Sequence, residues 1–322
     1  MALPKRVRIY EVGPREGFQF EKGPISTDDK VALVDALSET GLGSIEVTSF
    51  VSPKWVPQMA DAEEVLARIR RKPGVEYRAL FLNLKGLERA LKANVTIDGE
   101  IILAASDKFL RTNNNRSIDD ALAAIPEWIA AYERAGIPVN QLDLMTTFGC
   151  NYEGHISLER VLDVLGRAAA ILEQHGHKVE RIKLADTMGW ANPAQVKRTI
   201  YALRERWPDA RLCLHLHDTR GTGLANAFAA LEEGVTEFES AVGGLGGCPF
   251  ASMKGAAGNI ATEDFAFMCE EMGVETGIDL EAIAEAARLA ERIVGHDLPG
   301  KLAKGGLMRD VRPGTWAAQV AG

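Results

Sequence analysis

Residues 181–218, RIKLADTMGWANPAQVKRTIYALRERWPDARLCLHLHD, contain two short runs of strand type with a helical pattern between them. The runs Arg181–Thr187 and Arg211–Asp218 alternate polar and apolar residues, as half-buried β-strands do. Between them, Pro193 stands where proline is favoured, at the first position of a helix, and the pattern predicts a helix over Pro193–Arg206. The stretch therefore predicts a strand–helix–strand unit with parallel strands.

The same unit recurs along the chain. The predicted strands are Val7–Val12, Ser44–Phe50, Tyr77–Asn83, Glu100–Ser106, Gln141–Thr147, Arg181–Thr187, Arg211–Asp218 and Thr236–Val242. The predicted helices are Thr27–Glu39, Asp61–Arg71, Lys85–Ala93, Ile118–Arg134, Leu158–His175, Pro193–Arg206, Leu224–Glu233, Glu263–Met272 and Leu280–Val294. Eight such units favour an α/β fold of the (β/α)₈ TIM-barrel class.

A doubly wound open sheet is the competing topology, but no G-x-G-x-x-G follows a predicted strand. We expect one catalytic domain over residues 1–322, since no linker divides the chain. Its eight β/α units would cover about residues 7–272, and an extra C-terminal helical extension would cover about residues 273–300.

The composition is that of an ordinary globular enzyme. The 322 residues include 37 basic and 45 acidic side chains, and this acidic balance argues against nucleic acid or an anionic membrane surface as a partner. Four cysteines, none in a C-x-x-C pair, indicate a reducing compartment. Because we find no signal peptide and no membrane-spanning stretch, we expect a cytoplasmic protein.

In a TIM barrel the functional side chains lie at the carboxyl ends of the strands and in the loops that follow. Polar residues collect at these places in the sequence. They include Arg15, Glu16, Glu46, Ser49, Asn83, Lys183, Asp186, His215 and His217.

His215 and His217 form the sharpest local motif. Since side chains alternate along a strand, both imidazoles point to the same face, where two nitrogens can bind a divalent metal. A pair of histidines hydrogen-bonded in a polar core is the alternative. Glu16 would add a carboxylate, which favours Mg²⁺ or Mn²⁺ over a cysteine-rich zinc site, although a surface carboxylate is the simpler interpretation of Glu16 alone.

Two loops carry further candidates. The loop after Thr236–Val242 is dense in glycine and holds Cys248, which could be a proton donor, a nucleophile or an ordinary small residue. The loop after Glu100–Ser106 holds Asn113 and Arg116. These two residues could bind a phosphate-bearing ligand or simply precede a helix capped by Ser117.

Six segments resemble the 3-hydroxy-3-methylglutaryl-CoA lyase family. They are Val12–Gly17 (VGPREG), Ile45–Asp61 (IEVTSFVSPKWVPQMAD), Asn83–Gly86 (NLKG), His215–Thr219 (HLHDT), Gly244–Phe250 (GLGGCPF) and Gly258–Asp264 (GNIATED). The segments occur in order over nearly the whole chain. The family lies within a wider metal-dependent group that also contains isopropylmalate and homocitrate synthases.

The resemblance implies a TIM barrel that cleaves a 3-hydroxyacyl-CoA into acetyl-CoA and a carbonyl product. Carried over by position, the ligands of Mg²⁺ or Mn²⁺ would be Glu16, His215, His217 and Asn259. The catalytic residues would be Arg15 at the enolate oxygen, Cys248 as a proton donor, and Glu46 and Asp186 near the reacting centre. We predict substrate contacts from Ser49, Asn83, Asn113, Arg116 and Lys183. The family also suggests a homodimer.

The sequence departs from the family pattern at two informative positions. Glu16 stands where the family usually has Asp, and Lys183 stands where a small hydroxyl residue is expected. A cation at position 183 could meet an extra carboxylate on the substrate or pair with Glu16. The alternatives to the lyase are a related lyase or aldolase with another 3-hydroxyacyl substrate, a Claisen-type synthase, and a barrel that binds metal and ligand without turnover.

Overall fold

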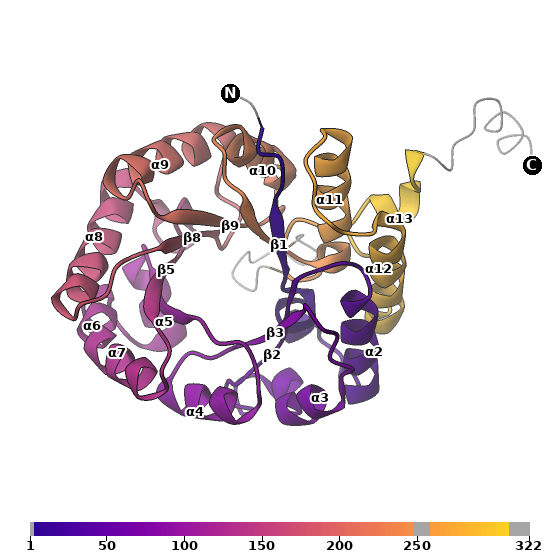
Figure 1. Cartoon of the computed structure of the whole chain (residues 1–322), viewed down its shortest axis with the longest axis horizontal. Helices are drawn as coiled ribbons and strands as arrows, with labels where there is room; N and C mark the ends of the chain where they lie inside the picture. Colours follow the sequence, from indigo (N-terminus) through magenta and orange to yellow (C-terminus); the bar gives the residue numbers. More distant parts are fainter. Residues whose placement is uncertain (1–2, 248–257, 309–322) are drawn as a thin grey trace, which may run out of the picture.

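Eight parallel strands form one curled sheet in the computed structural model, which describes residues 3–247 and 258–308. The strands are β1 (Arg8–Glu11), β2 (Ser44–Ser49), β3 (Glu76–Leu80), β4 (Gly99–Ala104), β5 (Val139–Met145), β8 (Arg181–Asp186), β9 (Arg211–Leu216) and β10 (Glu237–Ser240). Their order in the sheet is β3-β2-β1-β10-β9-β8-β5-β4. A parallel bridge links Arg78 of β3 to Thr96, which lies just before β4, and the strands form a ring (Figure 1). The predicted TIM-barrel fold is confirmed.

Helices surround the ring of strands, as Figure 1 shows along the barrel axis. They are α1 (Phe18–Phe20), α2 (Thr27–Ser38), α3 (Ala62–Arg68), α4 (Leu84–Lys92), α5 (Asp107–Asn114), α6 (Ile118–Ala123), α7 (Ile125–Arg134), α8 (Leu158–Gln174), α9 (Pro193–Arg206), α10 (Gly223–Glu232), α11 (Thr262–Glu271), α12 (Leu280–Val294) and α13 (Leu302–Gly305). Side-chain caps begin two of these helices, since Ser26 accepts a hydrogen bond from Asp29 N and Asn192 forms a capping box with Gln195.

The loop after β4 differs most from the prediction. The segment 107–114 is a helix, α5, because the Ser106 hydroxyl accepts a hydrogen bond from Phe109 N and caps it. The single helix predicted over Ile118–Arg134 is wrong. It is divided into α6 and α7 at Ala124, because Pro126 has no N–H for the i→i−4 hydrogen bond. A short unpredicted hairpin, β6 (Gly149–Cys150) and β7 (Gly154–His155), follows β5.

The two faces of the strands have different surroundings. Outward-facing residues such as Ile182 and Leu184 are fully buried against the helices. Phe238 of β10 packs on Phe265 of α11 with ring centroids 4.7 Å apart. The inward-facing positions, by contrast, carry charged groups, and this lumen holds the site described below.

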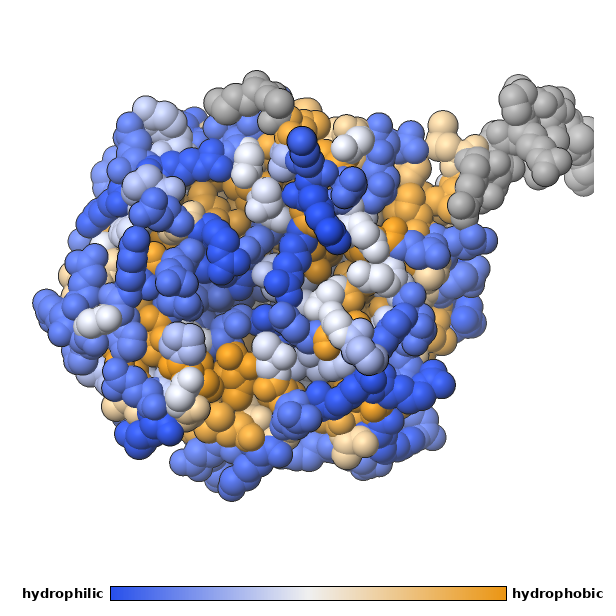
Figure 2. Space-filling view, in the orientation of Figure 1, coloured by the Kyte–Doolittle hydropathy of each residue, from blue (hydrophilic) through white to orange (hydrophobic). Residues whose placement is uncertain are grey.

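The outer surface is mainly hydrophilic in the view along the axis, with hydrophobic side chains visible beside α4 and α7 (Figure 2). Among the residues that the structure describes, no helix is both long enough and apolar enough to span a bilayer.

Candidate metal centre

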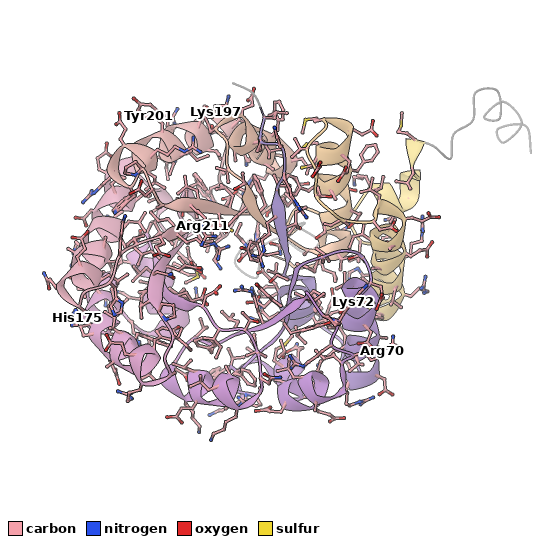
Figure 3. The ribbon with its side chains drawn as sticks, in the orientation of Figure 1. Arg70, Lys72, His175, Lys197, Tyr201 and Arg211 are labelled. Atoms are coloured by element: carbon pink, nitrogen blue, oxygen red, sulfur yellow. The ribbon has the colours of Figure 1, made fainter. Side chains whose placement is uncertain are left out.

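The two histidines of the predicted motif meet Glu16 inside the barrel. His215 lies in β9 and His217 follows the strand, and their Nε2 atoms are 3.2 Å apart. Glu16 Oε1 lies 3.1 Å from His217 Nε2 and 3.6 Å from His215 Nε2. All three side chains are buried, whereas His175 lies at the outer rim of the helices (Figure 3). The same-face prediction for the two histidines is therefore confirmed.

Asn259 completes this cluster. Its backbone forms an antiparallel bridge with His217, and its Nδ2 donates to Glu16 Oε1 at 3.1 Å. The Asn259 Oδ1 atom is buried and has no hydrogen-bond partner among the described residues. A carboxylate, two imidazole nitrogens and an amide oxygen are ligands that divalent cations accept in proteins. The four residues fit a divalent metal.

Two glycines allow Asn259 to approach Glu16. A Cβ on Gly258 would lie 2.4 Å from the carbonyl carbon of Gly246. Gly246 has φ +106°, and a Cβ there would lie 2.9 Å from Asn259 Nδ2. These contacts are shorter than side chains tolerate, so only glycine fits at this crossing of the chain.

Arg15 lies beside the cluster, in the π-helical turn η1 (Gly13–Gly17) after β1. Its Nη2 is 3.0 Å from Glu16 Oε2, and its Nε donates to Glu46 Oε2. Burial would lower the pKa of Arg15, but Glu46 and Glu16 outweigh it and raise this pKa. Two carboxylates thus fix a permanently charged guanidinium next to the candidate metal ligands.

Glu239 orients His215 from the opposite side. The Oε2 atom of Glu239 lies 2.8 Å from His215 Nδ1, which leaves Nε2 facing Glu16. Burial alone would lower the pKa of His215, but Glu16 and Glu239 outweigh it and raise this pKa to about 10. A metal at this site would therefore displace a proton from His215.

Lys183 has carboxylate partners within the barrel. Its Nζ is 2.7 Å from Asp143 Oδ2, 2.8 Å from Glu239 Oε1 and 4.0 Å from Glu100 Oε2. Pairing with Glu16, one of the two possibilities raised for Lys183, is therefore not found, because neighbouring strands place these three carboxylates at its ammonium group. Whether Lys183 also contacts a substrate stays a prediction.

We expect Lys183→Met to lower the free energy of unfolding by about 3–5 kcal/mol at neutral pH, because Asp143 and Glu239 would lose their buried cation. The native protein holds the pKa of Glu239 below its usual value, although burial opposes this. That stabilisation is present above the unfolded pKa and is lost on acidification. The difference between the two proteins should therefore shrink as the pH falls below about 4.5.

Urea unfolding at neutral and acidic pH measures this difference. Lys178→Met is the matched control, because Lys178 forms an exposed ion pair with Asp209. Its replacement should change the free energy of unfolding little. A loss in Lys183→Met no larger than that in the control would contradict the assigned role of Lys183.

Asp186 and Ser49 are the last residues of β8 and β2, so both lie at the carboxyl end of the barrel strands. Asp186 is fully buried, and its carboxylate accepts hydrogen bonds from Trp190 N at 2.7 Å and Ala191 N at 3.1 Å. Burial raises the pKa of Asp186. The Ser49 hydroxyl is buried at the end of β2, with no hydrogen-bond partner in the described part of the chain.

The other predicted substrate residues are not joined to the cluster by any hydrogen bond or ion pair within the described ranges. Asn83 caps α4 by accepting a hydrogen bond from Gly86 N at 2.8 Å. Asn113 and Arg116 are exposed around the end of α5. Cys248 lies outside the described residues. The proposed roles of these four residues stay predictions.

Sequence reasoning missed Glu239 and Glu11. Glu11 is fully buried at the end of β1, and its carboxylate accepts hydrogen bonds from Gly13 N, Val242 N and the Thr262 hydroxyl. It therefore ties together three loops at the carboxyl edge of the barrel. A carboxylate within a predicted strand was the available signal for both residues.

Known proteins are similar to this chain over nearly its whole length. Residues 6–290 match the HMGL-like family. The chain belongs to the HMGL-like family. It is 42% identical to a hydroxymethylglutaryl-CoA lyase of Bacillus subtilis, over 94% of this chain and 97% of the relative. It is 43% identical to the 3-hydroxy-3-isohexenylglutaryl-CoA/hydroxymethylglutaryl-CoA lyase of Pseudomonas aeruginosa, over 94% of this chain and 98% of the relative.

A solved structure of an HMG-CoA lyase from Acinetobacter baumannii, in complex with coenzyme A and 3-methylmalate, superposes with a TM-score of 0.85. It is 40% identical and covers 97% of this chain and 99% of its own. The resemblance inferred from the sequence is thereby confirmed. The family consists of carbon–carbon lyases that depend on a divalent metal, and Glu16, His215 and His217 form a possible metal site in this member.

Proposed function

We propose that this protein is a metal-dependent lyase that cleaves 3-hydroxy-3-methylglutaryl-CoA into acetyl-CoA and acetoacetate. The observation that carries the proposal is the convergence of Glu16, His215 and His217 beside Arg15, at the carboxyl end of the barrel strands. Relatives with this activity in their names are about 42% identical over nearly the whole chain.

Glu16, His215, His217 and Asn259 would hold the metal, and we propose Mg²⁺ or Mn²⁺. Carboxylate and amide oxygens suit both cations, and no cysteine adjoins the cluster among the described residues. When bound, such an ion supplies a Lewis acid that lowers the pKa of the substrate 3-hydroxyl.

Arg15 is proposed to stabilise the negative charge that develops during cleavage. As the bond between C2 and C3 of the acyl group breaks, its electron pair moves into an enolate of acetyl-CoA, while the 3-hydroxyl becomes the ketone of acetoacetate. The guanidinium is held in place by Glu46 and Glu16 before substrate binds. Such preorganised charge needs no rearrangement in the transition state.

Two protons must move for this reaction to balance. One leaves the 3-hydroxyl, and one is added to the enolate carbon. We propose that Asp186 or Glu46 accepts the first, since Asp186 ends β8 and the Glu46 carboxylate contacts Arg15. Cys248, on the segment after β10, is the proposed donor of the second.

Product analysis tests the proposed function. Protein stripped of metal by a chelator is incubated with 3-hydroxy-3-methylglutaryl-CoA, with and without Mn²⁺, and both products are quantified by chromatography. We expect acetyl-CoA and acetoacetate in equal amounts only when Mn²⁺ is present. No cleavage with Mn²⁺, together with net condensation in a parallel incubation with acetyl-CoA and a keto acid, would favour the synthase instead.

The homodimer and the cytoplasmic location remain part of this proposal. Light scattering of the purified protein should give about twice the chain mass of 34.9 kDa. A mass of one chain would contradict the homodimer and leave the proposed activity unaffected.

A further inference from the structure

Glu11 is a fully buried carboxylate at the end of β1 that the proposed chemistry does not use. Its Oε1 accepts hydrogen bonds from Gly13 N at 2.7 Å and Val242 N at 2.9 Å, and its Oε2 accepts one from the Thr262 hydroxyl at 2.6 Å. Burial raises the pKa of Glu11 to about 7, and these donors oppose the rise. Because all three neighbours are donors, the position favours a group that only accepts, as an ionised carboxylate does.

The first donor belongs to the turn that carries Glu16. Gly13 begins η1, and within this turn Glu16 N donates a hydrogen bond to Val12 O at 2.8 Å. A Cβ on Gly13 would lie 2.5 Å from Glu11 Oε1, so the turn starts in contact with the carboxylate. The hydrogen bond to Gly13 therefore fixes where η1 leaves β1 and, with it, where Glu16 lies.

The other two donors come before and after Asn259 in the sequence. Three residues after Val242, the Leu245 carbonyl accepts a hydrogen bond from Asn259 Nδ2 at 3.3 Å. Thr262 is the first residue of α11, three positions after Asn259. Glu11 thus binds the chain on both sides of the crossing that brings Asn259 into the cluster.

The two imidazoles have a different support. His215 lies in β9, and its Nδ1 contacts Glu239 of β10. His217 follows directly after the same strand. The oxygen ligands are therefore held through Glu11, whereas the nitrogen ligands are held by the sheet.

We propose that Glu11 is a positioning residue that assembles the oxygen half of the metal centre, by holding Glu16 and Asn259 opposite the two histidines. The inference rests on the proposed function and deepens it. It predicts a specific failure when Glu11 is changed, because the oxygen ligands shift while both imidazoles stay in place. Mn²⁺, which suits oxygen ligands, should then lose more affinity than Ni²⁺, which suits imidazole.

The test measures the dissociation constants of Mn²⁺ and Ni²⁺ in the full-length protein by isothermal titration calorimetry, at about pH 8, where Glu11 is ionised. Glu11→Gln keeps the size of the side chain but turns an amide NH₂ toward a donor. We expect it to weaken Mn²⁺ binding by about 10–100-fold and Ni²⁺ binding by less than about threefold. Glu270→Gln is the matched control, because Glu270 accepts hydrogen bonds from the backbone N–H and the hydroxyl of Thr276, before α12. It should leave both constants unchanged.

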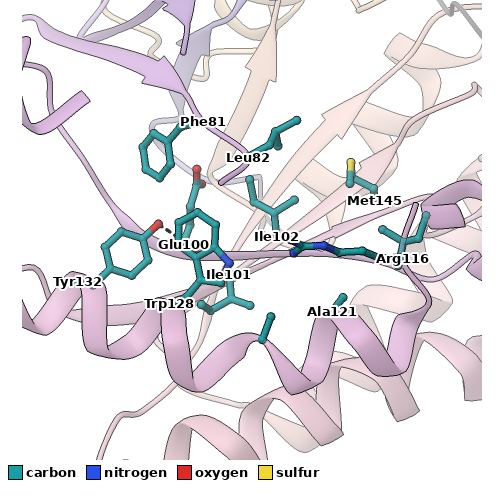
Figure 4. Close-up of a pocket in the computed structure, with 12 residues that line it drawn as sticks. Phe81, Leu82, Glu100, Ile101, Ile102, Arg116, Ala121, Trp128, Tyr132 and Met145 are labelled. Atoms are coloured by element: carbon teal, nitrogen blue, oxygen red, sulfur yellow. Dashed lines mark hydrogen bonds between the residues drawn. The ribbon is translucent and has the colours of Figure 1, made fainter. Parts of the chain in front are cut away.

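A second variant keeps Glu11 and removes one donor. Thr262→Val should weaken Mn²⁺ binding by about 3–10-fold and leave Ni²⁺ binding unchanged. Tyr132→Phe is its control, since Tyr132 is also buried and loses one hydroxyl hydrogen bond, to Glu100 O at 3.1 Å. Figure 4 shows this bond beside α7, and Figure 1 shows α7 and α11 on opposite sides of the barrel. A general loss of stability would therefore appear in Tyr132→Phe without a loss of Mn²⁺ affinity.

Unchanged Mn²⁺ affinity in Glu11→Gln and Thr262→Val would overturn the inference, and so would equal losses of affinity for Mn²⁺ and Ni²⁺. If Glu11→Gln does not fold, the result with Thr262→Val decides. A wild type that binds no Mn²⁺ would contradict the metal centre itself, and with it the proposed function.

Discussion

Replacement of His217 with alanine is expected to lower kcat/KM by at least about 10³-fold and to weaken Mn²⁺ binding strongly. His217 Nε2 lies within 3.2 Å of the candidate ligand atoms of Glu16 and His215, so its loss opens the centre of the cluster. A loss of this size corresponds to about 4 kcal/mol of transition-state stabilisation, within what a metal ion supplies. Steady-state kinetics and titration of Mn²⁺ by electron paramagnetic resonance measure the two effects.

His155→Ala is the matched control for this variant. His155 lies in the exposed hairpin strand β7 and contacts Gln195. The His155→Ala variant should keep the activity and the Mn²⁺ affinity of the wild type. Wild-type kinetics in His217→Ala would remove the histidine cluster from the mechanism.

A change of Arg15 to glutamine should lower kcat by about 10²–10³-fold, the usual cost of removing one group that stabilises an oxyanion. KM should change much less, because the interaction forms as charge develops in the transition state. Arg15→Lys should restore part of the activity, since it keeps the charge and loses the bidentate geometry.

The Mn²⁺ affinity of Arg15→Gln separates this role from a structural one. Arg15 contacts Glu16 through Oε2, whereas the histidines contact Oε1. We therefore expect the affinity to change by less than about tenfold, well below the loss in kcat. Equal losses of affinity and kcat would show that Arg15 acts only by holding Glu16.

Local patterns were sufficient to predict the barrel. The strands alternate between two faces, as the buried outer Ile182 and the inward Lys183 do in β8. Pro193 marked the start of one helix, since it occupies the first position of α9. The helix α5 was missed because its polar sequence, DKFLRTNN, resembles a loop unless the Ser106 cap is recognised. That residues 1–322 form a single domain stays a prediction.

The candidate site was predictable where the relevant residues share one strand. The shared face of His215 and His217 followed from the two-residue period of side chains along a strand. The role of Asn259 needed the resemblance, because its approach to Glu16 depends on a chain crossing between residues far apart in the sequence. The carboxylate partners of Lys183 come from three other strands, so only the register of the sheet reveals them.

The central claim is that a divalent ion at Glu16, His215 and His217 is required for thioester cleavage. It is tested most directly by titrating metal-free protein with Mn²⁺ while both bound metal and acetyl-CoA formation are measured. We predict that activity is absent without metal, rises in proportion to bound Mn²⁺ and reaches its plateau at one ion per chain. Full cleavage activity in the metal-free protein, or activity unrelated to the bound metal, would contradict the account.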